Sequence, residues 1–158
     1  MCIMQYRLLC ATLLFIFVAA EKSNTKFNDC GSLYATIVSV QVNPCQGKPC
    51  VLVKGDQSSV TIRFRLKNTN FEPGKISLSG KVGKLDLPFP LHDANVCDHI
   101  KQGCPLKSTS DIYEFEYTNH IKKSYPSLNV NIKWSLLDTA NKPFLCVQFP
   151  VALQNSSA

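Results

Sequence analysis

The chain has 158 residues, 45% of them hydrophobic, and a formal net charge of +6 at pH 7. A length of this order corresponds to one domain. Its lysines stand mostly alone, and Arg63 and Arg65 are the only arginines after residue 20. The dense basic patch of a nucleic-acid-binding protein is therefore missing, whereas weak attraction to an anionic membrane surface is compatible with the charge.

Residues 1–20 have the composition of a signal peptide. Arg7 is their only charge, an apolar run follows from Leu8, and small residues precede Glu21. The run is too short to span a bilayer, which takes about 20 apolar residues. We expect a signal peptide over 1–20 and a mature domain over 21–158 that is secreted, with the lysosomal lumen as the alternative destination.

Apolar and polar residues alternate along most of the mature chain, and no segment has helical periodicity. In 59–67, for example, Val60, Ile62 and Phe64 share one face. The segments expected as strands are 33–42, 51–54, 59–67, 75–82, 85–90, 113–117, 128–136 and 144–153. Seven or eight strands separated by turn residues predict an all-β fold, either a sandwich of antiparallel sheets or a barrel.

The segment 85–90 is an unusual strand candidate. Leu85, Leu87 and Phe89 alternate with other residues, yet Pro88 and Pro90 have no N–H for a ladder. The segment therefore cannot be a fully paired central strand. It is either a protected edge strand or the lip of an opening between two sheets.

Loss of residues 1–20 would remove Cys2 and Cys10 and leave 8 − 2 = 6 cysteines. An even number in an exported chain predicts three disulfides. The economical pairing, one of 15, is Cys30–Cys146, Cys45–Cys50 and Cys97–Cys104.

A metal site is the alternative use of Cys97, because His92, Asp93, Asp98 and His99 lie near it in the sequence. Zinc sites of this kind need reduced thiolates at regular spacing, and neither the expected compartment nor the spacing agrees. We expect ordinary loop residues beside a disulfide, with no metal.

No catalytic motif is evident around His92, His99 and His120. Glu114 and Glu116 share one strand face and would suit a carboxylate pair. They are better explained as the polar half of an alternating strand. We expect neither an enzyme nor a cofactor.

Alternation by itself favours a solid core between the sheets. Two local features favour a ligand cavity instead. One is the unpairable 88–90 stretch, and the other is 121–126, also interrupted by proline and carrying an aromatic residue, just before the strand of Trp134. If both flank one gap, an apolar mouth beside Lys122 and Lys123 would suit an amphiphile whose polar end stays in water.

A collinear set of short motifs resembles one known family. The set is Asp29-Cys30-Gly31-Ser32, Pro44-Cys45 to Pro49-Cys50 with Lys54-Gly55, Pro88-Phe89-Pro90, Cys97 to Cys104-Pro105, Tyr125-Pro126-Ser127, Trp134, and Phe144-Leu145-Cys146 before Pro150-Val151. Over essentially the whole mature chain it resembles the ML lipid-recognition domain family, which includes soluble sterol carriers, insect homologues and mite group 2 allergens.

The resemblance implies an immunoglobulin-like sandwich with a lipid cavity between its sheets and the disulfide pairing given above. It implies lipid contacts by Val42, Leu52, Val60, Leu85, Leu87, Phe89, Ile121, Tyr125, Pro126, Val130 and Trp134. Phe89 and Tyr125 would guard the entrance, with Ile121 beside them. Strand alternation independently places five of these residues on inward faces, namely Val60, Leu87, Phe89, Val130 and Trp134.

The expected protein is thus a lumenal or secreted carrier of a sterol-like or other small apolar lipid, with transient membrane or acceptor-protein contact. His120 replaces the proline typical of the carriers, and Leu85 and Leu87 are bulkier than the expected valines, so fatty acids and semiochemicals stay open as ligands. Immune presentation of microbial lipid and a solid-cored interaction protein are the rival functions. Asn155 begins a weak glycosylation sequon near the end of the chain.

Overall fold

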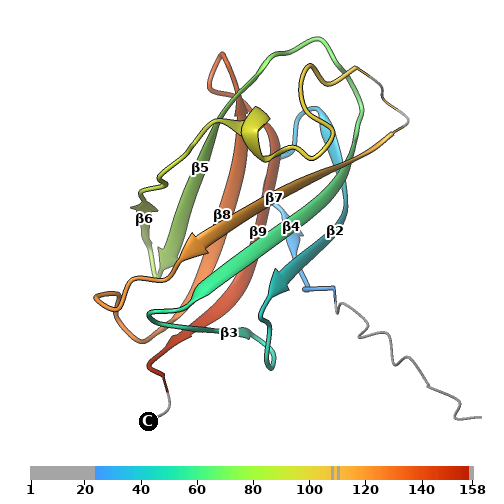
Figure 1. Ribbon diagram of the computed structural model, residues 1–158. Coiled ribbons are helices and arrows are strands. Elements are labelled where there is room, and N and C mark those ends of the chain that lie inside the picture. Colours follow the sequence, from blue (N-terminus) through green and yellow to red (C-terminus); the bar gives the residue numbers. More distant parts are fainter. Residues whose placement is uncertain (1–23, 108, 110, 157–158) are drawn as a thin grey trace, which may run out of the picture.

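The computed structural model describes residues 24–107, 109 and 111–156. The expected signal peptide and the start of the expected mature domain lie outside these residues. Within them, two β-sheets pack face to face as an immunoglobulin-like sandwich (Figure 1). The elements are β1 Asn28–Asp29, β2 Ala35–Asn43, β3 Cys50–Val53, β4 Gln57–Leu66, β5 Pro73–Val82, β6 Leu85–Phe89, the 3-10 helix η1 Val96–His99, β7 Ile112–His120, β8 Asn129–Asp138 and β9 Pro143–Gln154.

The eight strands expected from alternation are all present, and the all-β sandwich is confirmed. Two short elements were not predicted, the two-residue β1 and the single turn η1. Neither is long enough to show a periodic pattern.

One sheet has the strand order β1-β9-β8-β5-β6, with β3 also paired to β9, and the other has the order β2-β4-β7. All pairs are antiparallel except that of β3 with β9, which runs parallel from Cys50↔Val151 to Val53↔Gln154. The sheets are therefore antiparallel as expected, with this one short parallel pair added at the side of β9. The strands before and after β3, which are β2 and β4, both belong to the smaller sheet. β3 therefore forms no hairpin with either of them and pairs instead with β9.

Strand β6 lies at the edge of the larger sheet and pairs only with β5 in the described part of the chain. Pro88 is the one proline within β6, and an edge strand tolerates it because only one side of the strand has a hydrogen-bonding neighbour. The edge position is confirmed for residues 85–89, and it also places Phe89 at the side of the sandwich where an opening was expected.

One end of the sandwich interior is filled by aromatic rings from both sheets and from the β4–β5 connection. Phe64 lies between Tyr113 at 5.8 Å and Phe144 at 6.3 Å, measured between ring centroids. Phe71 packs against Phe144 at 4.7 Å with the rings tilted, and it stacks on Tyr34 at 5.2 Å. We call these five residues the packed end.

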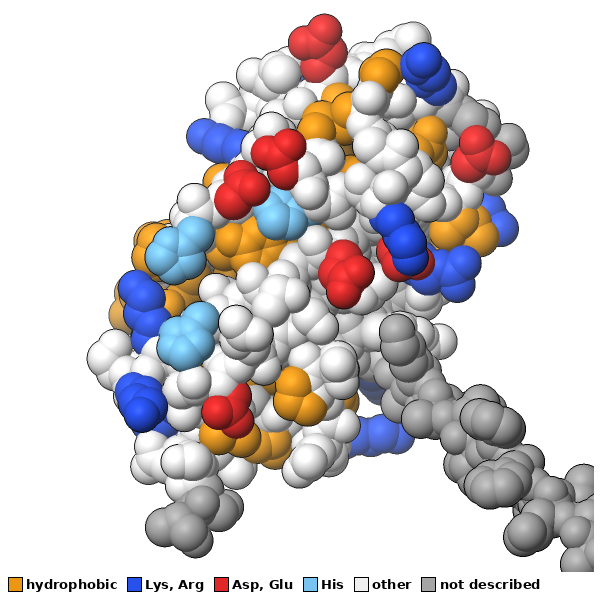
Figure 2. Space-filling view, in the orientation of Figure 1, with side chains coloured by type: hydrophobic (Ala, Val, Ile, Leu, Met, Phe, Trp, Pro, Cys, Tyr) orange, Lys and Arg blue, Asp and Glu red, His pale blue; other side chains and the backbone are white. Residues whose placement is uncertain are grey.

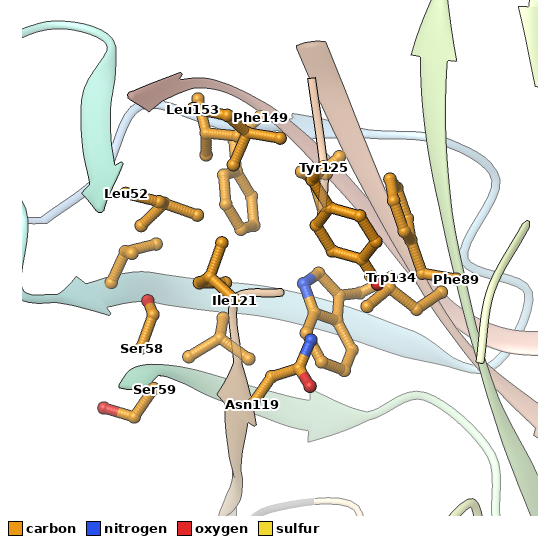
Figure 3. A pocket seen from close by; sticks show the side chains of 15 residues that line it. Leu52, Ser58, Ser59, Phe89, Asn119, Ile121, Tyr125, Trp134, Phe149 and Leu153 are labelled. Carbon is orange, nitrogen blue, oxygen red and sulfur yellow. The ribbon is translucent and has the colours of Figure 1, made fainter. Parts of the chain in front are cut away.

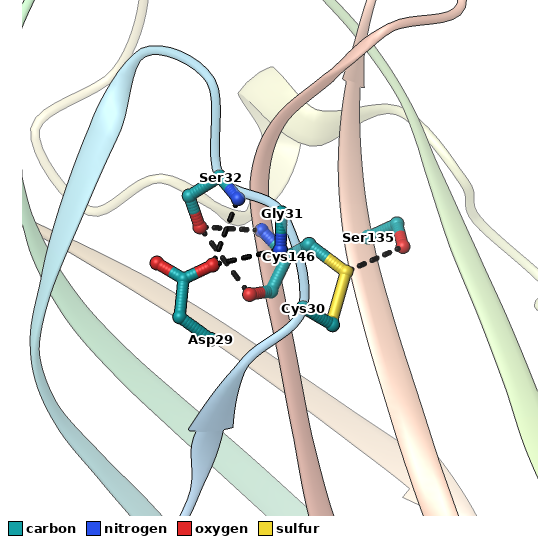
Figure 4. Close-up of a disulfide and its surroundings, with 6 residues drawn as sticks. All are labelled: Asp29, Cys30, Gly31, Ser32, Ser135 and Cys146. Carbon is teal, nitrogen blue, oxygen red and sulfur yellow. Dashed lines mark hydrogen bonds between the residues drawn. A yellow bond between two sulfur atoms is a disulfide. The ribbon is translucent and has the colours of Figure 1, made fainter.

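The three disulfides of the economical pairing are present, Cys30–Cys146, Cys45–Cys50 and Cys97–Cys104. The first ties β1 to β9, and Figure 4 shows its surroundings. The Asp29 carboxylate accepts hydrogen bonds from the backbone N–H groups of Gly31 and Ser32, and the Ser32 hydroxyl accepts one from the N–H of Cys146.

These bonds decide the ionisation of Asp29. Partial burial acts to raise the pKa of its carboxyl, but the hydrogen bonds from Ser32 and Gly31 outweigh burial and lower that pKa below the ordinary 3.8. The turn after β1 is therefore fastened by an ionised acid.

No helix among the described residues is long and apolar enough to cross a membrane.

Candidate functional site

A cavity lies between the sheets at the end opposite the aromatic cluster, beside β3. Its lining, shown in Figure 3, consists of Val42, Leu52, Ser58, Ser59, Val60, Leu78, Phe89, Asn119, Ile121, Tyr125, Ile132, Trp134, Phe149, Val151 and Leu153. Its empty volume is about 530 Å³, counting the part open to solvent. The enclosed part is narrow, so a ligand as large as a sterol requires the sheets to separate further. We call this region the hollow end.

The hollow end arises from a change of side-chain size along the strands. The inward residues of β4 grow from Ser58 through Val60 and Ile62 to Phe64 at the packed end. In β7 the inward series begins with Tyr113 and ends with Asn119. The small side chains at these ends of two neighbouring strands do not fill the distance to the opposite sheet that aromatic rings fill at the other end, so space remains between the sheets.

Two aromatic residues close the cavity on the side of β6. The rings of Phe89 and Tyr125 lie in contact, with centroids 5.2 Å apart at an angle of 60°. Phe89 can lie across β5 because position 80 is glycine. A Cβ on Gly80 would come within 2.6 Å of the Phe89 ring and 2.8 Å of Val130. The absence of a side chain at Gly80 therefore leaves the space that the Phe89 ring occupies.

The segment that carries Tyr125 is held by the turn after β3. The N–H of Gly55 donates to the carbonyl of Ile121, and the N–H of Ile121 donates to the carbonyl of Asp56. The Lys54 ammonium donates to the Tyr125 carbonyl at 3.0 Å. Backbone bonds thus fix one end of the segment, and a lysine side chain fixes the end nearest the ring.

None of the 15 side chains that line the cavity carries a charge. Burial raises the pKa of the Tyr125 hydroxyl, so this group stays protonated at neutral pH. The polar side chains of the lining are confined to Ser58, Ser59 and Asn119 on β4 and β7, apart from the ring ends of Tyr125 and Trp134. Such a surface accommodates an apolar molecule and offers few polar contacts.

Of the residues expected to contact lipid, seven line this cavity: Val42, Leu52, Val60, Phe89, Ile121, Tyr125 and Trp134. Val130 is buried next to Gly80, behind the Phe89 ring, and is absent from the lining. Pro126 is exposed and also outside the lining.

Leu85 and Leu87, also expected to contact lipid, lie outside the lining of this cavity. Leu87 pairs with Gly80 and Leu85 with Val82, so both lie on the inward face of the sheet, as alternation predicts. Nevertheless Leu87 is 46% exposed and Leu85 67% exposed. The three-stranded sheet has no strand opposite this end of β6, so the two leucines are left uncovered beside the rings of Phe89 and Tyr125, which we call the aromatic gate.

Eight lining residues were missed by the sequence analysis: Ser58, Ser59, Leu78, Asn119, Ile132, Phe149, Val151 and Leu153. Most are ordinary inward residues of strands that were predicted. The informative signal was the shrinking inward series of β4, which ends at Ser58, and the polar residue Asn119 that ends the inward face of β7.

None of the groups considered for catalysis is among the residues that line the cavity. Glu114 is paired with Lys101 at 3.2 Å and with Arg63 at 3.8 Å on the outer face of the smaller sheet. His99 lies 3.3 Å from Asp93 and packs on the Tyr117 ring. Cys97 is held in its disulfide and so offers no thiolate to a metal.

Comparison with known proteins agrees with this architecture. The sequence family described as the ML domain matches residues 24–153. The chain belongs to the ML domain family. Among curated ML relatives, NPC intracellular cholesterol transporter 2 of Bos taurus is 34% identical over 151 residues, 90% of this chain and 97% of that protein.

An allergen and a solved structure provide two further comparisons. Mite group 2 allergen Der p 2 of Dermatophagoides pteronyssinus is 31% identical over 78% of this chain and 80% of the allergen. A solved structure of a Niemann–Pick type C2 protein from the Japanese carpenter ant superimposes with a TM-score of 0.73 at 22% identity, covering 82% of this chain and 99% of that one. This structural match establishes the shared fold.

Proposed function

We propose that this ML-domain protein is a non-catalytic carrier that holds one sterol-like or other small apolar lipid between its sheets. The observation that carries the proposal is the uncharged cavity of the hollow end, closed by Phe89 and Tyr125. The bovine relative is named a cholesterol transporter, which supports a sterol as the ligand class.

Burial of apolar surface supplies the binding energy. A ligand that buries about 500 Å² of apolar area gains on the order of 12 kcal/mol before the costs of association and of opening the cavity are subtracted. Micromolar to nanomolar affinity follows. Such affinity suits a carrier, which must both hold its ligand and release it.

Ligand exchange requires the rings of Phe89 and Tyr125 to part. Beside them, the exposed Leu85 and Leu87 add apolar surface at the β6 edge, where Figure 2 shows hydrophobic side chains gathered on the visible face. Contact of this edge with a membrane or an acceptor protein would shield a lipid from water as it leaves. We further propose that residues 1–20 are removed and that the mature domain acts in a secreted or lysosomal compartment.

The proposal is tested by the binding of a fluorescent sterol analogue to the purified mature protein. We expect saturation near one ligand per chain. Phe89→Ala should weaken binding strongly, because it opens the gate and removes contact area. Glu116→Ala changes an exposed residue on the outer face of β7 and is the matched control. The absence of saturable binding across a broad lipid panel would refute the carrier function.

A further inference from the structure

The polar side chains of the cavity wall form a single group at the ends of two paired strands. Ser58 of β4 and Asn119 of β7 are direct partners in the sheet register. Both continue the inward faces of their strands, beyond Val60 and Tyr117. In Figure 3 the Ser58 hydroxyl points up into the cavity and the Asn119 amide extends toward the Trp134 indole. The rest of the wall is almost wholly apolar.

Most of these polar groups have no hydrogen-bond partner in the part of the protein that the structure describes. The neighbouring Ser59 turns its hydroxyl outward and donates to the Asn43 carbonyl on β2. The Ser58 hydroxyl, the Asn119 amide and the Trp134 indole N–H make no side-chain hydrogen bond to a described residue. A polar group that faces an apolar space destabilises the protein unless a ligand or a water molecule forms a hydrogen bond with it.

We propose that Asn119, assisted by Ser58, anchors the single polar group of the carried lipid and selects an uncharged alcohol. The inference rests on the proposed carrier function and names its ligand class more narrowly. An amide both donates and accepts hydrogen bonds, and so does a hydroxyl group, whereas an ether only accepts. A carboxylate fits poorly, because none of the lining side chains is a cation that would compensate for its desolvation.

Asn119 is also well placed to hold a polar group near water. Its side chain is only partly buried, and β7 is the edge strand of the smaller sheet. A lipid anchored there keeps its polar end at the rim of the sandwich, and its apolar body extends among Val60, Leu153 and the other aliphatic residues. Asn119 is thus a specificity-determining residue rather than part of the aromatic gate.

The test measures displacement of the fluorescent probe N-phenyl-1-naphthylamine by three ligands of one chain length: hexadecan-1-ol, hexadecyl methyl ether and palmitate, at pH 7.4. In the wild-type protein the alcohol should displace the probe at a concentration roughly tenfold lower than the ether, the effect of one buried hydrogen bond. Palmitate should be weaker than the alcohol.

Asn119→Leu should abolish the preference for the alcohol and leave the ether unchanged. Ser58→Ala should reduce the preference only in part. Thr118→Val, on the exposed outer face of the same strand, is the matched control and should behave as wild type. Thermal melts establish that each variant folds, and the three-ligand comparison in the wild-type protein needs no variant at all.

Equal binding of alcohol and ether by the wild-type protein would overturn the anchor while leaving the carrier function intact. A preference that survives in Asn119→Leu, or palmitate binding tighter than the alcohol, would likewise overturn it. Failure of the probe and all three ligands to bind would refute the carrier function itself, and the anchor with it.

Discussion

The two ends of the sandwich interior are built from the same strands and the same alternation, yet one is solid and the other is hollow. At the packed end, Phe64, Phe144 and Tyr113 interlock across the sheets. At the hollow end the same strands present smaller residues, such as Val60 and Val151. The alternation of apolar and polar residues determines which face of each strand points inward. The volume of the inward side chains determines whether they reach the side chains of the opposite sheet.

Each end also has its own fastening. The packed end is closed by the Cys30–Cys146 disulfide and the hydrogen-bonded turn at Asp29. The hollow end is closed by the aromatic gate and the contact of Lys54 with the Tyr125 carbonyl. The Cys30–Cys146 bridge joins segments 116 residues apart at the packed end, whereas the Cys45–Cys50 bridge beside the hollow end closes only its own short loop. The aromatic rings that close the hollow end are held by noncovalent contacts, which can open. Stability and exchange are thus assigned to different ends of one domain.

The largest expected difference concerns the cost of removing a leucine. Leu136 is fully buried near the packed end. The substitution Leu136→Ala should therefore lower the free energy of unfolding by about 3–5 kcal/mol. Leu153→Ala should cost about 2 kcal/mol, because one side of Leu153 already faces the cavity and has fewer contacts to lose. Urea denaturation of both variants measures the difference, and equal costs would contradict a hollow interior.

Filling the hollow end should separate binding from folding. Val60→Phe places a ring in the cavity and should lower affinity for a fluorescent sterol more than tenfold, with a stability change below about 1 kcal/mol. Ile62→Phe, two residues along the same strand at a fully buried site, should instead destabilise the fold by about 1–3 kcal/mol. Undiminished binding by a well-folded Val60→Phe protein would place the ligand elsewhere.

Loosening the gate should change the exchange rate. Lys54→Met keeps the side-chain length but loses the 3.0 Å hydrogen bond to the Tyr125 carbonyl. Ligand release, followed by stopped-flow transfer to vesicles, should accelerate about two- to tenfold, the worth of one net hydrogen bond. Lys122→Met, at an exposed position of the same segment, is the control. A rate unaffected by Lys54→Met would mean that this contact does not limit opening.

The smallest expected effect lies at the turn after β1. The folded protein holds the Asp29 proton less tightly than the unfolded chain does, because hydrogen bonds to the carboxylate lower its folded-state pKa. Its stabilisation is therefore present above about pH 4 and is lost as the pH falls through the folded-state pKa. Asp29→Asn should flatten the acid side of the Tm profile, with a change below about 2 °C at pH 7. Asp86→Asn is an exposed control, and identical acid profiles for the two variants would contradict this role.

Alternation in the sequence located the strands and the inward faces, and the proline-interrupted segments located Phe89 and Tyr125. Alternation could not show that Leu85 and Leu87 are uncovered, because their exposure depends on how far the opposite sheet extends in the folded protein. It also passed over Ser58 and Asn119, which look like the polar ends of strands until the register pairs them. The parallel contact of β3 with β9 joins segments about 100 residues apart and leaves no local trace.

The hollow end can be tested most directly through Trp134, the only tryptophan of the chain, whose ring lines the cavity. During titration with a fluorescent sterol, we expect energy transfer from Trp134 to the bound ligand, and this signal should saturate at one ligand per chain. The signal should be lost in Val60→Phe. The packed-end variant Leu136→Ala, if folded, should retain it. A saturable signal of the same strength in folded Val60→Phe, or no saturation in the wild-type protein, would contradict a lipid held between the sheets.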